Sequence, residues 1–251
     1  MKVSIITVVY NNAETISDCL QSVFHQDYPN IEYVVVDGGS NDGTMDILSR
    51  YSDCIAHLIS EPDRGIYDAM NKGIAACSGE VVGILNSDDI YADERVISDV
   101  VEALDLSQSE SCYGDLVYVN RRNTEKIQRT WRAGEYDRKQ FLRGWMPPHP
   151  TFFVKRVCYE QYGAFNLDFK TSADYELMLR MLYKHGVSST YLNRVLVKMR
   201  SGGQSNVSLV NRIKANLEDR KAWKVNGIKQ PFFTTFRKPI SKLGQFLKKG
   251  G

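Results

Sequence analysis

The sequence predicts an α/β fold, in which a mostly parallel sheet is flanked by helices and followed by a helical C-terminal extension. Two observations predict it. Short runs of β-branched residues alternate with stretches of helical apolar spacing through the first hundred residues. The chain has 251 residues, of which 43% are hydrophobic, so one substantial core can form without division into two domains.

Four short runs are predicted to form strands because they are apolar and rich in β-branched residues. They are Val3–Val9, Ile31–Val36, Ile55–Ile59 and Val81–Leu85. Apolar residues recur at helical spacing from Ile16 to Phe24 and again from Ile66 to Cys77. The order strand, helix, strand is typical of parallel strands joined by crossover helices.

The pattern is less regular after residue 110. A hairpin is predicted from Cys112–Val119 and Lys126–Trp131, and a helix near residues 173–185. Between them lies a Met-Pro-Pro-His-Pro loop at 146–150. No internal repeat or low-complexity segment is found.

The net charge of +2 hides an asymmetry. Residues 221–251 contain eight basic residues and no acidic one, which leaves −6 for residues 1–220. A basic tail favours a polyanion or an anionic membrane surface. A helix that starts at Pro239 would present an apolar side edged by lysines, so residues 237–251 are a candidate interfacial anchor. The alternatives are an ordinary terminal helix packed on the domain and a disordered basic end.

The chain is expected to be cytoplasmic. No apolar run reaches the roughly 18 residues of a membrane-spanning helix, and the N-terminus enters a strand-like run without a signal-peptide layout. The cysteines are odd in number and form no CxxC pair, which predicts small core residues in a reducing compartment. They are Cys19, Cys54, Cys77, Cys112 and Cys158.

Polar residues follow each of the four predicted strands of the first half. In such sheets ligands bind beyond the carboxyl ends of the strands, so these positions are candidate site residues. They are Tyr10, Asn11 and Asn12, then Asp37, then Glu61, and finally Asn86, Ser87, Asp88 and Asp89. Carboxylates therefore converge on one edge of the predicted sheet.

The strongest signal is the segment Asn86–Asp89. Adjacent carboxylates at a strand end repel each other unless a cation, a hydrogen-bond donor or solvent offsets the charge. A Mg²⁺ or Mn²⁺ ion on diphosphate oxygens would supply the cation, since such ions are often held by one or two carboxylates and substrate phosphates. The alternative is a turn whose Ser and Asp side chains cap the following helix.

The loop Asp37–Thr44 is the second candidate. The Asp37 carboxylate can accept hydrogen bonds from a nucleobase or a ribose, and the adjacent glycines let the backbone approach a ligand closely. The alternative is a tight turn without a ligand. We interpret Asp37 as a ligand-binding residue and Asp42 as a residue that starts the next helix.

Four stretches then occur in a characteristic order: VSIITVVYNN at 3–12, VDGGSNDGT at 36–44, DRGIYDAMNKGI at 63–74 and LNSDD at 85–89. Together they resemble the family 2 glycosyltransferases of the GT-A fold. A weaker match continues through His149-Pro150-Thr151 and Ser172–Glu176 to about Ser205.

The resemblance implies a domain organisation. A GT-A, Rossmann-like catalytic domain is expected over residues 1–205. Its nucleotide-sugar-binding half would span residues 1–110 and its acceptor-binding half residues 111–205. The helical basic extension would then be residues 206–251.

The resemblance also implies a donor pocket. Thr7, Tyr10 and Asp37 are implied to contact the donor base and ribose. Many relatives have an arginine where this chain has Met70, which leaves Arg64 and Lys72 as the candidate cations for base or diphosphate contacts.

The family's metal-binding DxD motif corresponds to Asn86-Ser87-Asp88. Asp88 is implied to bind the metal, and Asn86 and Ser87 join it as predicted donor contacts. Because Asn86 replaces the first aspartate of the motif, Asp89 is a second candidate metal ligand.

The general base is implied to be Asp174. Displacement by an alcohol requires removal of the hydroxyl proton, which a carboxylate beside the acceptor can accept. The residue pattern alone also fits a carboxylate that interacts with the dipole of its helix. Glu176 is a weaker candidate that would orient a neighbour.

Two further residues are implied to lie in the acceptor or diphosphate region. His149 matches a family histidine, although a loop histidine is commonly just a polar surface group. Arg200 opens the segment Arg200–Ser205, which resembles a flexible family segment that closes over the donor and whose arginine neutralises the leaving diphosphate. A simple surface turn at Gly202 and Gly203 is the alternative.

The resulting prediction is an inverting glycosyltransferase that uses Mg²⁺ or Mn²⁺ to move a sugar from a nucleotide-sugar donor, a UDP-sugar first of all, to an acceptor hydroxyl. The expected acceptor is a saccharide or lipid-linked saccharide of surface-polysaccharide or glycoconjugate biosynthesis. The enzyme is expected in the cytoplasm or peripherally on the inner face of the cell membrane, with no nucleic-acid partner.

Three rival readings remain. A catalytically silent nucleotide-sugar-binding protein of the same fold would keep the pocket without the reaction. A sugar-nucleotide pyrophosphorylase would favour a Gly-rich loop after the first strand, where this chain has Tyr10-Asn11-Asn12. A nucleotide-redox enzyme is disfavoured because no GxGxxG motif follows that strand.

Overall fold

The strands predicted in the first half lie side by side. In the computed structural model, which describes residues 1–202 and 209–229, β1 lies between β2 and β4, β3 pairs with β2, and all these pairs are parallel. The strands are β1 (Val3–Val9), β2 (Ile31–Asp37), β3 (His57–Ser60) and β4 (Val81–Ile84). The third strand therefore begins two residues later than predicted.

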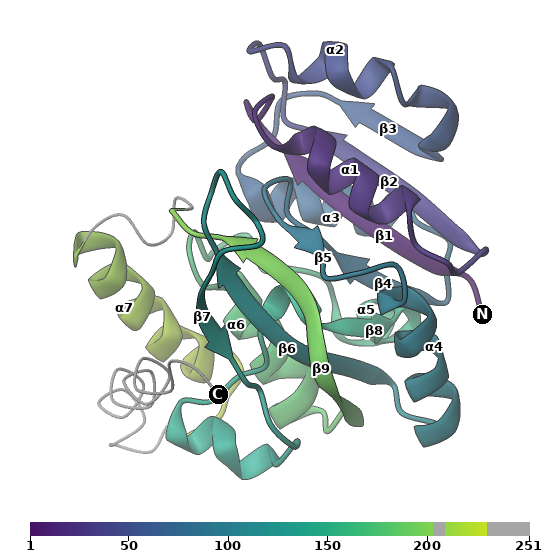
Figure 1. Ribbon diagram of the computed structural model, residues 1–251. Helices are drawn as coiled ribbons and strands as arrows, with labels where there is room; N and C mark the ends of the chain where they lie inside the picture. The colour runs from purple at the N-terminus through teal and green to yellow at the C-terminus, as the bar shows by residue number, and fades with distance from the viewer. Residues whose placement is uncertain (203–208, 230–251) are drawn as a thin grey trace.

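The described part of the chain has nine strands in one sheet, with the order β3-β2-β1-β4-β8-β6-β9-β5 and with β7 paired to β6 (Figure 1). The later strands are β5 (Ile90–Tyr91), β6 (Ser111–Val119), β7 (Ile127–Trp131), β8 (Phe153–Lys155) and β9 (Ser189–Arg200). Because β8 is antiparallel to both β4 and β6, these two strands run in the same direction, and β9 is parallel to β6. The predicted α/β fold with a mostly parallel sheet is thus confirmed.

Helices cover both faces of the sheet because alternate residues of the strands point to opposite sides. Ile6 and Val8 of β1 pack with α3, α5 and α6, whereas Val3, Ile5 and Val9 pack with α1, α2 and α4. The helices are α1 (Ile16–Phe24), α2 (Thr44–Ser49), α3 (Ile66–Ala76), α4 (Val96–Ser107), α5 (Arg156–Tyr162) and α6 (Ala173–Met178).

Helix α3 lies directly against β1. A Cβ added at Gly73 would come within 2.4 Å of Ile6 Cγ2, so a larger residue would force the helix away from the strand. The helix that carries Tyr67 is therefore fixed at a short distance from the centre of the sheet.

The second half confirms the predicted hairpin, since β6 and β7 pair in antiparallel fashion. The predicted helix near 173–185 is divided into α6 and a π-helical segment, Leu179–Lys184. The loop with three prolines ends in a short 3₁₀ turn, His149–Thr151; two further 3₁₀ segments are Ser52–Cys54 and Arg138–Arg143. Strands β8 and β9 and helix α5 had no counterpart in the sequence prediction.

Helix α7 (Leu209–Val225) joins the core beneath α6; its side chains are described from residue 217 onward. Ala222 and Trp223 are fully buried there, and the Trp223 indole N–H donates to the Tyr175 hydroxyl at 2.9 Å. The predicted anchor at residues 237–251 lies outside the described residues. Within the described ranges, no helix combines the length and apolar character needed to cross a bilayer.

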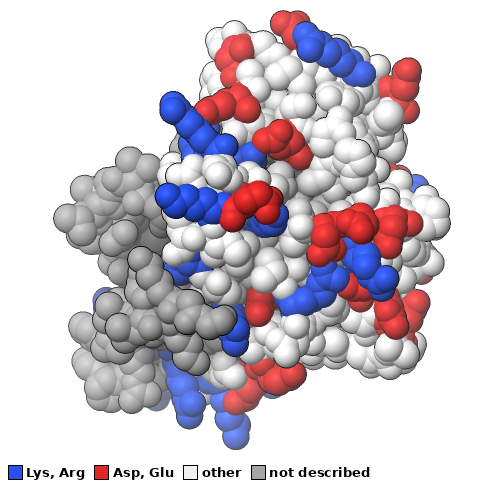
Figure 2. Space-filling view, in the orientation of Figure 1, with Lys and Arg blue, Asp and Glu red and all other residues white. Residues whose placement is uncertain are grey.

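The cysteines follow the prediction with one exception. Four cysteines are buried as predicted, but Cys54 is exposed because it lies in the 3₁₀ turn before β3 rather than on an apolar face. On the face shown in Figure 2, Lys and Arg side chains lie beside Asp and Glu side chains. Surface ion pairs of the described residues include those of Arg194 with Asp93 and of Lys198 with Glu125. Exposed pairs of this kind contribute little to stability.

Candidate functional site

The carboxyl ends of β1, β2 and β4 meet at one edge of the sheet, as predicted. The loop after β1 is hydrogen-bonded to the loops after both neighbours. Asn11 N donates to Ser40 Oγ at 2.8 Å, and Asn12 Nδ2 donates to Ser87 Oγ at 2.9 Å. Asn11 adopts a left-handed conformation with φ of 47°, which asparagine tolerates better than most residues. The three loops therefore form one continuous surface.

Tyr10 and Asp63 flank the backbone of Gly38 on that surface. A Cβ at Gly38 would lie 2.4 Å from Asp63 Oδ2 and 3.4 Å from the Tyr10 ring, so a larger residue would displace the Asp63 carboxylate. The Tyr10 side chain is 61% exposed. Asp63 Oδ1 also accepts from Gly65 N at 2.7 Å, at the start of α3. The sequence analysis included Asp63 in a motif but gave it no role.

Two predicted donor contacts point inward. The Asp37 carboxylate is fully buried and accepts from the Ser60 hydroxyl at 2.7 Å and from Ser40 N at 3.1 Å. The Thr7 hydroxyl is also fully buried and accepts from Tyr33 at 2.9 Å. In this structure Asp37 holds the loop after β2, and Thr7 belongs to the core beneath it. Contact of either side chain with a donor stays a prediction.

Asp88 and Asp89 lie in different environments although they are adjacent. The Asp88 carboxylate is half-buried and makes no hydrogen bond or ion pair with any described residue. Asp89 is fully buried and accepts from Asn86 Nδ2 at 3.1 Å. Burial, and then the charge of Asp88, raises the pKa of Asp89 well above its ordinary value. Its charged form is disfavoured, and its burial leaves Asp88 as the more accessible of the two carboxylates. Metal binding by either residue stays a prediction.

The oxygens of this loop suit a hard divalent cation. Asn86 Oδ1 is buried and has no hydrogen-bond partner, and it lies two residues from the unpaired carboxylate of Asp88. Carbonyl and carboxylate oxygens are the ligands that Mg²⁺ and Mn²⁺ prefer. In the described part of the chain, no three His, Cys, Asp or Glu side chains gather as a metal site. Substrate oxygens would therefore have to complete the coordination shell.

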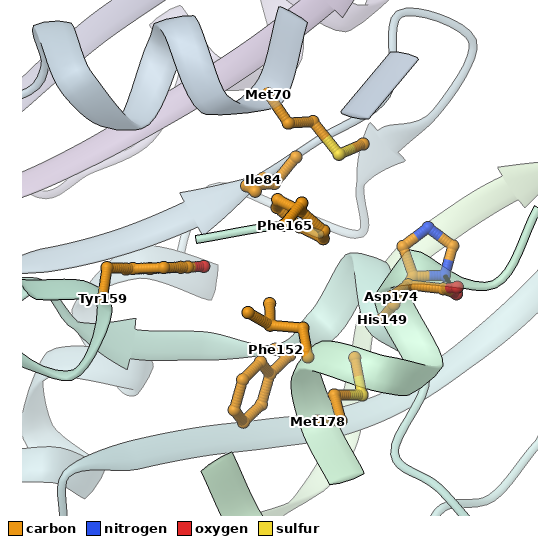
Figure 3. A pocket seen from close by; sticks show the side chains of 9 residues that line it. Met70, Ile84, His149, Phe152, Tyr159, Phe165, Asp174 and Met178 are labelled. Carbon is orange, nitrogen blue, oxygen red and sulfur yellow. Dashed lines mark ion pairs between the residues drawn. The ribbon is translucent and has the colours of Figure 1, made fainter. Parts of the chain in front are cut away.

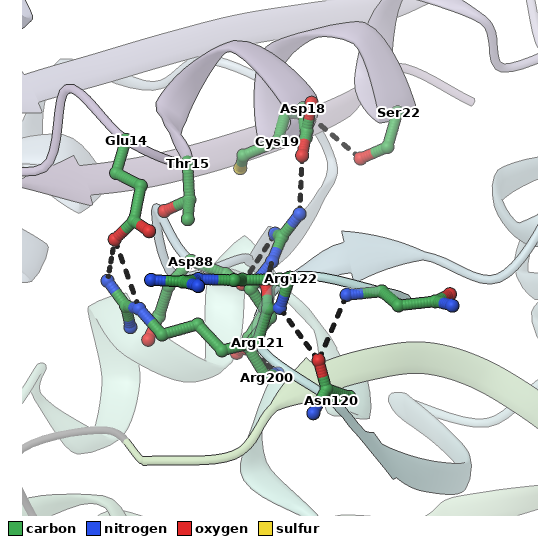
Figure 4. A network of polar contacts seen from close by, with 12 residues as sticks. Glu14, Thr15, Asp18, Cys19, Ser22, Asp88, Asn120, Arg121, Arg122 and Arg200 are labelled. Atoms are coloured by element: carbon green, nitrogen blue, oxygen red, sulfur yellow. Dashed lines mark hydrogen bonds and ion pairs between the residues drawn. The ribbon is translucent and has the colours of Figure 1, made fainter. Parts of the chain in front are cut away.

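Arg200 holds the Asn86–Asp89 loop in place from inside the fold (Figure 4). Its guanidinium donates to the Asp88 carbonyl at 2.9 Å and to the Arg121 carbonyl at 3.0 Å, and it pairs with Asp18. The side chain is only 3% exposed because it ends β9 inside the fold. In this structure Arg200 belongs to β9, and its contact with the leaving diphosphate stays a prediction. Residues 203–205 of the segment lie outside the described residues.

The other predicted cations are paired. Arg64 forms an ion pair with Asp68 at 2.7 Å, and Lys72 forms one with Glu61 at 2.8 Å. Their contacts with a donor stay predictions. The exposed Arg122, in the turn between β6 and β7, has no ion-pair partner among the described residues. This cation was not predicted, because a basic turn residue carries no distinctive signal in the sequence.

Asp174 and His149 come together although they lie on separate elements. His149 Nδ1 is 3.3 Å from Asp174 Oδ2, and both side chains are part-exposed, at 30% and 21%. Figure 3 shows the two side by side at one end of a small cavity of about 20 Å³. The rest of that cavity is mainly apolar, with Met70, Phe152, Phe165 and Met178 among its lining residues.

Tyr67 is a site residue that the sequence analysis missed. Its hydroxyl donates to Asp174 Oδ1 at 3.3 Å, and its ring stacks on Phe165. Burial, and then the charge of Asp174, raises the pKa of Tyr67, which keeps the hydroxyl protonated as a donor. The only sequence signal was its place within the stretch DRGIYDAMNKGI.

The first turn of α3 connects the two regions. Asp63 faces Gly38 just before the helix, and Tyr67 faces Asp174 within its first turn. A second pocket of about 250 Å³ lies between this turn and residues 167–170, and Tyr67 lines it. The geometry thus places an unpaired carboxylate on the sheet edge and a second, hydrogen-bonded carboxylate beside a cavity.

Comparison with known proteins identifies the family of this chain. A model of glycosyl transferase family 2 matches residues 4–159. An uncharacterised glycosyltransferase of Mycobacterium tuberculosis is 33% identical over 71% of this chain and 68% of the relative. A glycosyltransferase of the same species, named for PGL/p-HBAD biosynthesis, is 29% identical over 81% of this chain and 78% of the relative.

Solved structures show the same fold. S. aureus TarS in complex with UDP-GlcNAc superposes with a TM-score of 0.74 at 18% identity, covering 98% of this chain and 72% of that one. The mannosyltransferase PcManGT of Pyrobaculum calidifontis, in complex with GDP-Man and Mn²⁺, gives a TM-score of 0.66 at 23% identity. That match covers 98% of this chain and 69% of the other.

Proposed function

The chain belongs to glycosyl transferase family 2, and from this premise we propose that it is an inverting, metal-dependent enzyme that moves a sugar from a UDP-sugar to an acceptor hydroxyl. The observation that carries the proposal is the pairing of Asp174 with both His149 and Tyr67 beside a cavity. This carboxylate is oriented by two neighbours and still part-exposed, as a general base must be.

The donor is proposed to lie along the edge formed by β1, β2 and β4. Tyr10 offers an exposed ring for a nucleobase next to the Gly38 backbone. The further donor contacts proposed are Thr7, Asp37, Arg64, Lys72, Asn86, Ser87 and Asp88. The complex of TarS with UDP-GlcNAc supports a UDP-sugar, and the complex of PcManGT with GDP-Man makes a GDP-sugar the next donor to test.

Asp88, together with Asn86 Oδ1, is proposed to hold Mg²⁺ or Mn²⁺. The unpaired oxygens of these two residues support this choice, whereas the burial of Asp89 counts against its own candidacy. When bound, the ion would offset the negative charge that develops on the leaving diphosphate. The Mn²⁺ in the PcManGT complex supports the same assignment.

The proposed reaction is one displacement. The acceptor oxygen bonds to the anomeric carbon, the bond from that carbon to the diphosphate breaks, and Asp174 accepts the hydroxyl proton. Attack from the side opposite the leaving group inverts the anomeric configuration. His149 and Tyr67 hold the two carboxylate oxygens of Asp174, so that its orientation is set before the acceptor arrives.

The test uses a panel of UDP-GlcNAc, UDP-glucose, UDP-galactose, GDP-mannose and dTDP-rhamnose. We would measure thermal stabilisation and nucleotide release, with Mn²⁺ and with EDTA, for the full chain and for Asp88→Ala and Asp174→Asn. General-base removal is expected to lower turnover about 10² to 10⁴-fold. Asp46→Asn, an exposed residue on α2, is the matched control. Undiminished turnover in both site variants would remove the mechanism.

The acceptor and the location are also proposals. The relative named for PGL/p-HBAD biosynthesis supports a glycoconjugate acceptor, either a saccharide or a lipid-linked saccharide. A lipid-linked acceptor would place the enzyme at the inner face of the cell membrane. Vesicle flotation with and without residues 237–251 tests this placement, and equal flotation would argue against the tail as an anchor. Donor binding without any transfer would favour the silent binding protein.

A further inference from the structure

We propose that Glu218 of α7 positions the Asp174 base by holding the turn that begins α6. The inference rests on the proposed function, in which Asp174 accepts the acceptor proton. Glu218 is far along the chain from the loops that form the sheet edge. It also lies outside residues 4–159, which the family model matches. It is proposed as a positioning residue, because it acts on Asp174 through the backbone.

The contact is a carboxylate bound by a backbone turn. Glu218 accepts hydrogen bonds from three successive backbone N–H groups, those of Lys170 at 2.9 Å, Thr171 at 2.8 Å and Ser172 at 2.9 Å. The Thr171 hydroxyl donates to the same carboxylate at 2.8 Å. Hydrogen bonds to a charged acceptor are about twice as strong as neutral ones. Successive N–H groups of this kind form an anion-binding concavity, which here is occupied by the protein's own carboxylate.

This turn leads directly into the helix that carries Asp174. Ser172 is the N-cap residue of α6, and its carbonyl accepts from Glu176 N at 3.0 Å. The Ser172 side chain does not cap the helix. The start of α6 is therefore fixed by Glu218 from outside the helix, and Asp174 lies in the first turn after it.

Two more contacts, one from α7 and one from the residue directly after it, reach the same turn of α6. Trp223 Nε1 donates to the Tyr175 hydroxyl at 2.9 Å, and Asn226 Nδ2 donates to Glu176 Oε1 at 2.9 Å. Residues on both sides of Asp174 are thus held by α7 and by the turn residue that follows it. The angle at which Asp174 meets His149 and Tyr67 consequently depends on the position of α7.

Glu218 is suited to this task because it remains ionised. Burial alone would raise the pKa of Glu218, but the hydrogen bonds from the backbone of Lys170 and Thr171 outweigh it, and the pKa is lowered. A catalytic base displaced by about 1 Å can lose roughly 10²-fold in rate. Loss of the Glu218 contacts should therefore affect the chemical step more than donor binding.

The experiment compares full-length variants at a temperature at which all are folded. Nucleotide release from UDP-GlcNAc, or from the best donor of the panel, gives kcat and the donor KM. Glu218→Ala is expected to lower kcat at least 10-fold with the donor KM unchanged within twofold. Glu218→Gln keeps one acceptor oxygen and is expected to recover part of the rate. Glu32→Gln, which removes a similarly bonded carboxylate at the opposite edge of the sheet, should lower thermal stability and keep kcat.

The outcomes separate this inference from the proposed function. Full kcat in Glu218→Ala, together with a large loss in Asp174→Asn, overturns the inference alone. Full kcat in Asp174→Asn overturns the general-base role of Asp174 in the proposed function, on which the inference rests. If Glu218→Ala does not fold, Glu218→Gln decides through hydrogen exchange at the amides of residues 170–172. Faster exchange with reduced kcat supports the positioning role, and unchanged exchange and kcat refute it.

Discussion

Adjacent residues of identical type separate into different roles at the sheet edge. Asp88 is half-buried, whereas Asp89 is fully buried between Asn86 and the backbone of Arg200. The two side chains are chemically the same, so both were predicted from the sequence as candidate metal ligands. Burial makes the charge of Asp89 costly and leaves Asp88 as the accessible anion.

Tyr67 offers a test at the same scale. Tyr67→Phe removes the hydrogen bond to Asp174 and keeps the ring stacked on Phe165. A hydrogen bond to a charged group is worth about 1.5–3 kcal/mol, and we expect kcat to fall roughly 10- to 150-fold with little change in the donor KM. Steady-state nucleotide release measures both parameters.

A second tyrosine provides the control for this prediction. Tyr136 donates its hydroxyl to the Leu182 carbonyl at 3.0 Å and makes no contact with Asp174. Tyr136→Phe should therefore leave kcat unchanged. Equal kinetics in both variants would show that the Tyr67 hydroxyl does not act on the base.

Strand β9 is the element whose importance the sequence analysis underestimated. Most of its residues are only partly buried, so it lacks the continuous apolar run that identified β1 and β4. It ends at Arg200, which reaches back to the loop after β4. A strand from the second half of the chain thus fixes a loop of the first half.

Arg200→Lys tests the function of that connection. Lysine can keep the pair with Asp18 but cannot also donate to the carbonyls of Asp88 and Arg121. We expect the loop to lose order and the Kd for UDP with Mn²⁺, measured by calorimetry, to rise about tenfold, which corresponds to about 1.4 kcal/mol.

The matched control lies on the same strand. Arg194 pairs with Asp93 and Asp99 beside α4, away from the Asn86–Asp89 loop. Arg194→Lys should leave the Kd for UDP unchanged. A Kd for Arg200→Lys equal to that of the original protein would count against the loop-holding role.

At the scale of the whole molecule, a stabilising network lies at the edge of the sheet opposite the one where the donor is proposed to bind. At the amino ends of the strands, the buried Glu32 accepts from Lys2 Nζ at 2.6 Å and from Ser78 N at 2.6 Å. Burial alone would raise the pKa of Glu32, but the hydrogen bonds from Lys2, Ser4 and Ser78 outweigh it and hold the pKa well below its ordinary value. This network joins β1, β2 and the segment before β4.

Stability should depend on pH through Glu32. Because its folded-state pKa is lowered, its contribution is complete above the unfolded pKa of about 4.3 and is lost as the pH falls toward the folded value. Glu32→Gln should therefore lower the free energy of unfolding by about 1–3 kcal/mol at pH 7, with the difference shrinking below about pH 4. Urea unfolding followed by tryptophan fluorescence measures it.

An exposed carboxylate serves as the comparison. Glu125 pairs with Lys198 at the surface, and Glu125→Gln should change the free energy of unfolding by less than about 1 kcal/mol. A Glu32→Gln effect that stayed constant from pH 7 to pH 3 would contradict the assigned role of the ionised carboxylate.

The sequence by itself determined the α/β class, the parallel strands of the first half, the edge at which polar residues converge and the role of Asp42 at the start of α2. These follow from local periodicity and from residues placed directly after strands. Asp42 indeed accepts from Thr44 N at 3.0 Å, as a helix-starting residue should.

Only the tertiary structure decided which candidate residues are accessible and which contact one another. The burial of Asp89, the approach of His149 and Tyr67 to Asp174, and the hold of Glu218 on α6 all join segments far apart in the chain. Burial and charge depend on every element packed around a side chain. A strand or helix pattern in the sequence describes one element at a time. It therefore could not predict the burial or the charge state of these side chains.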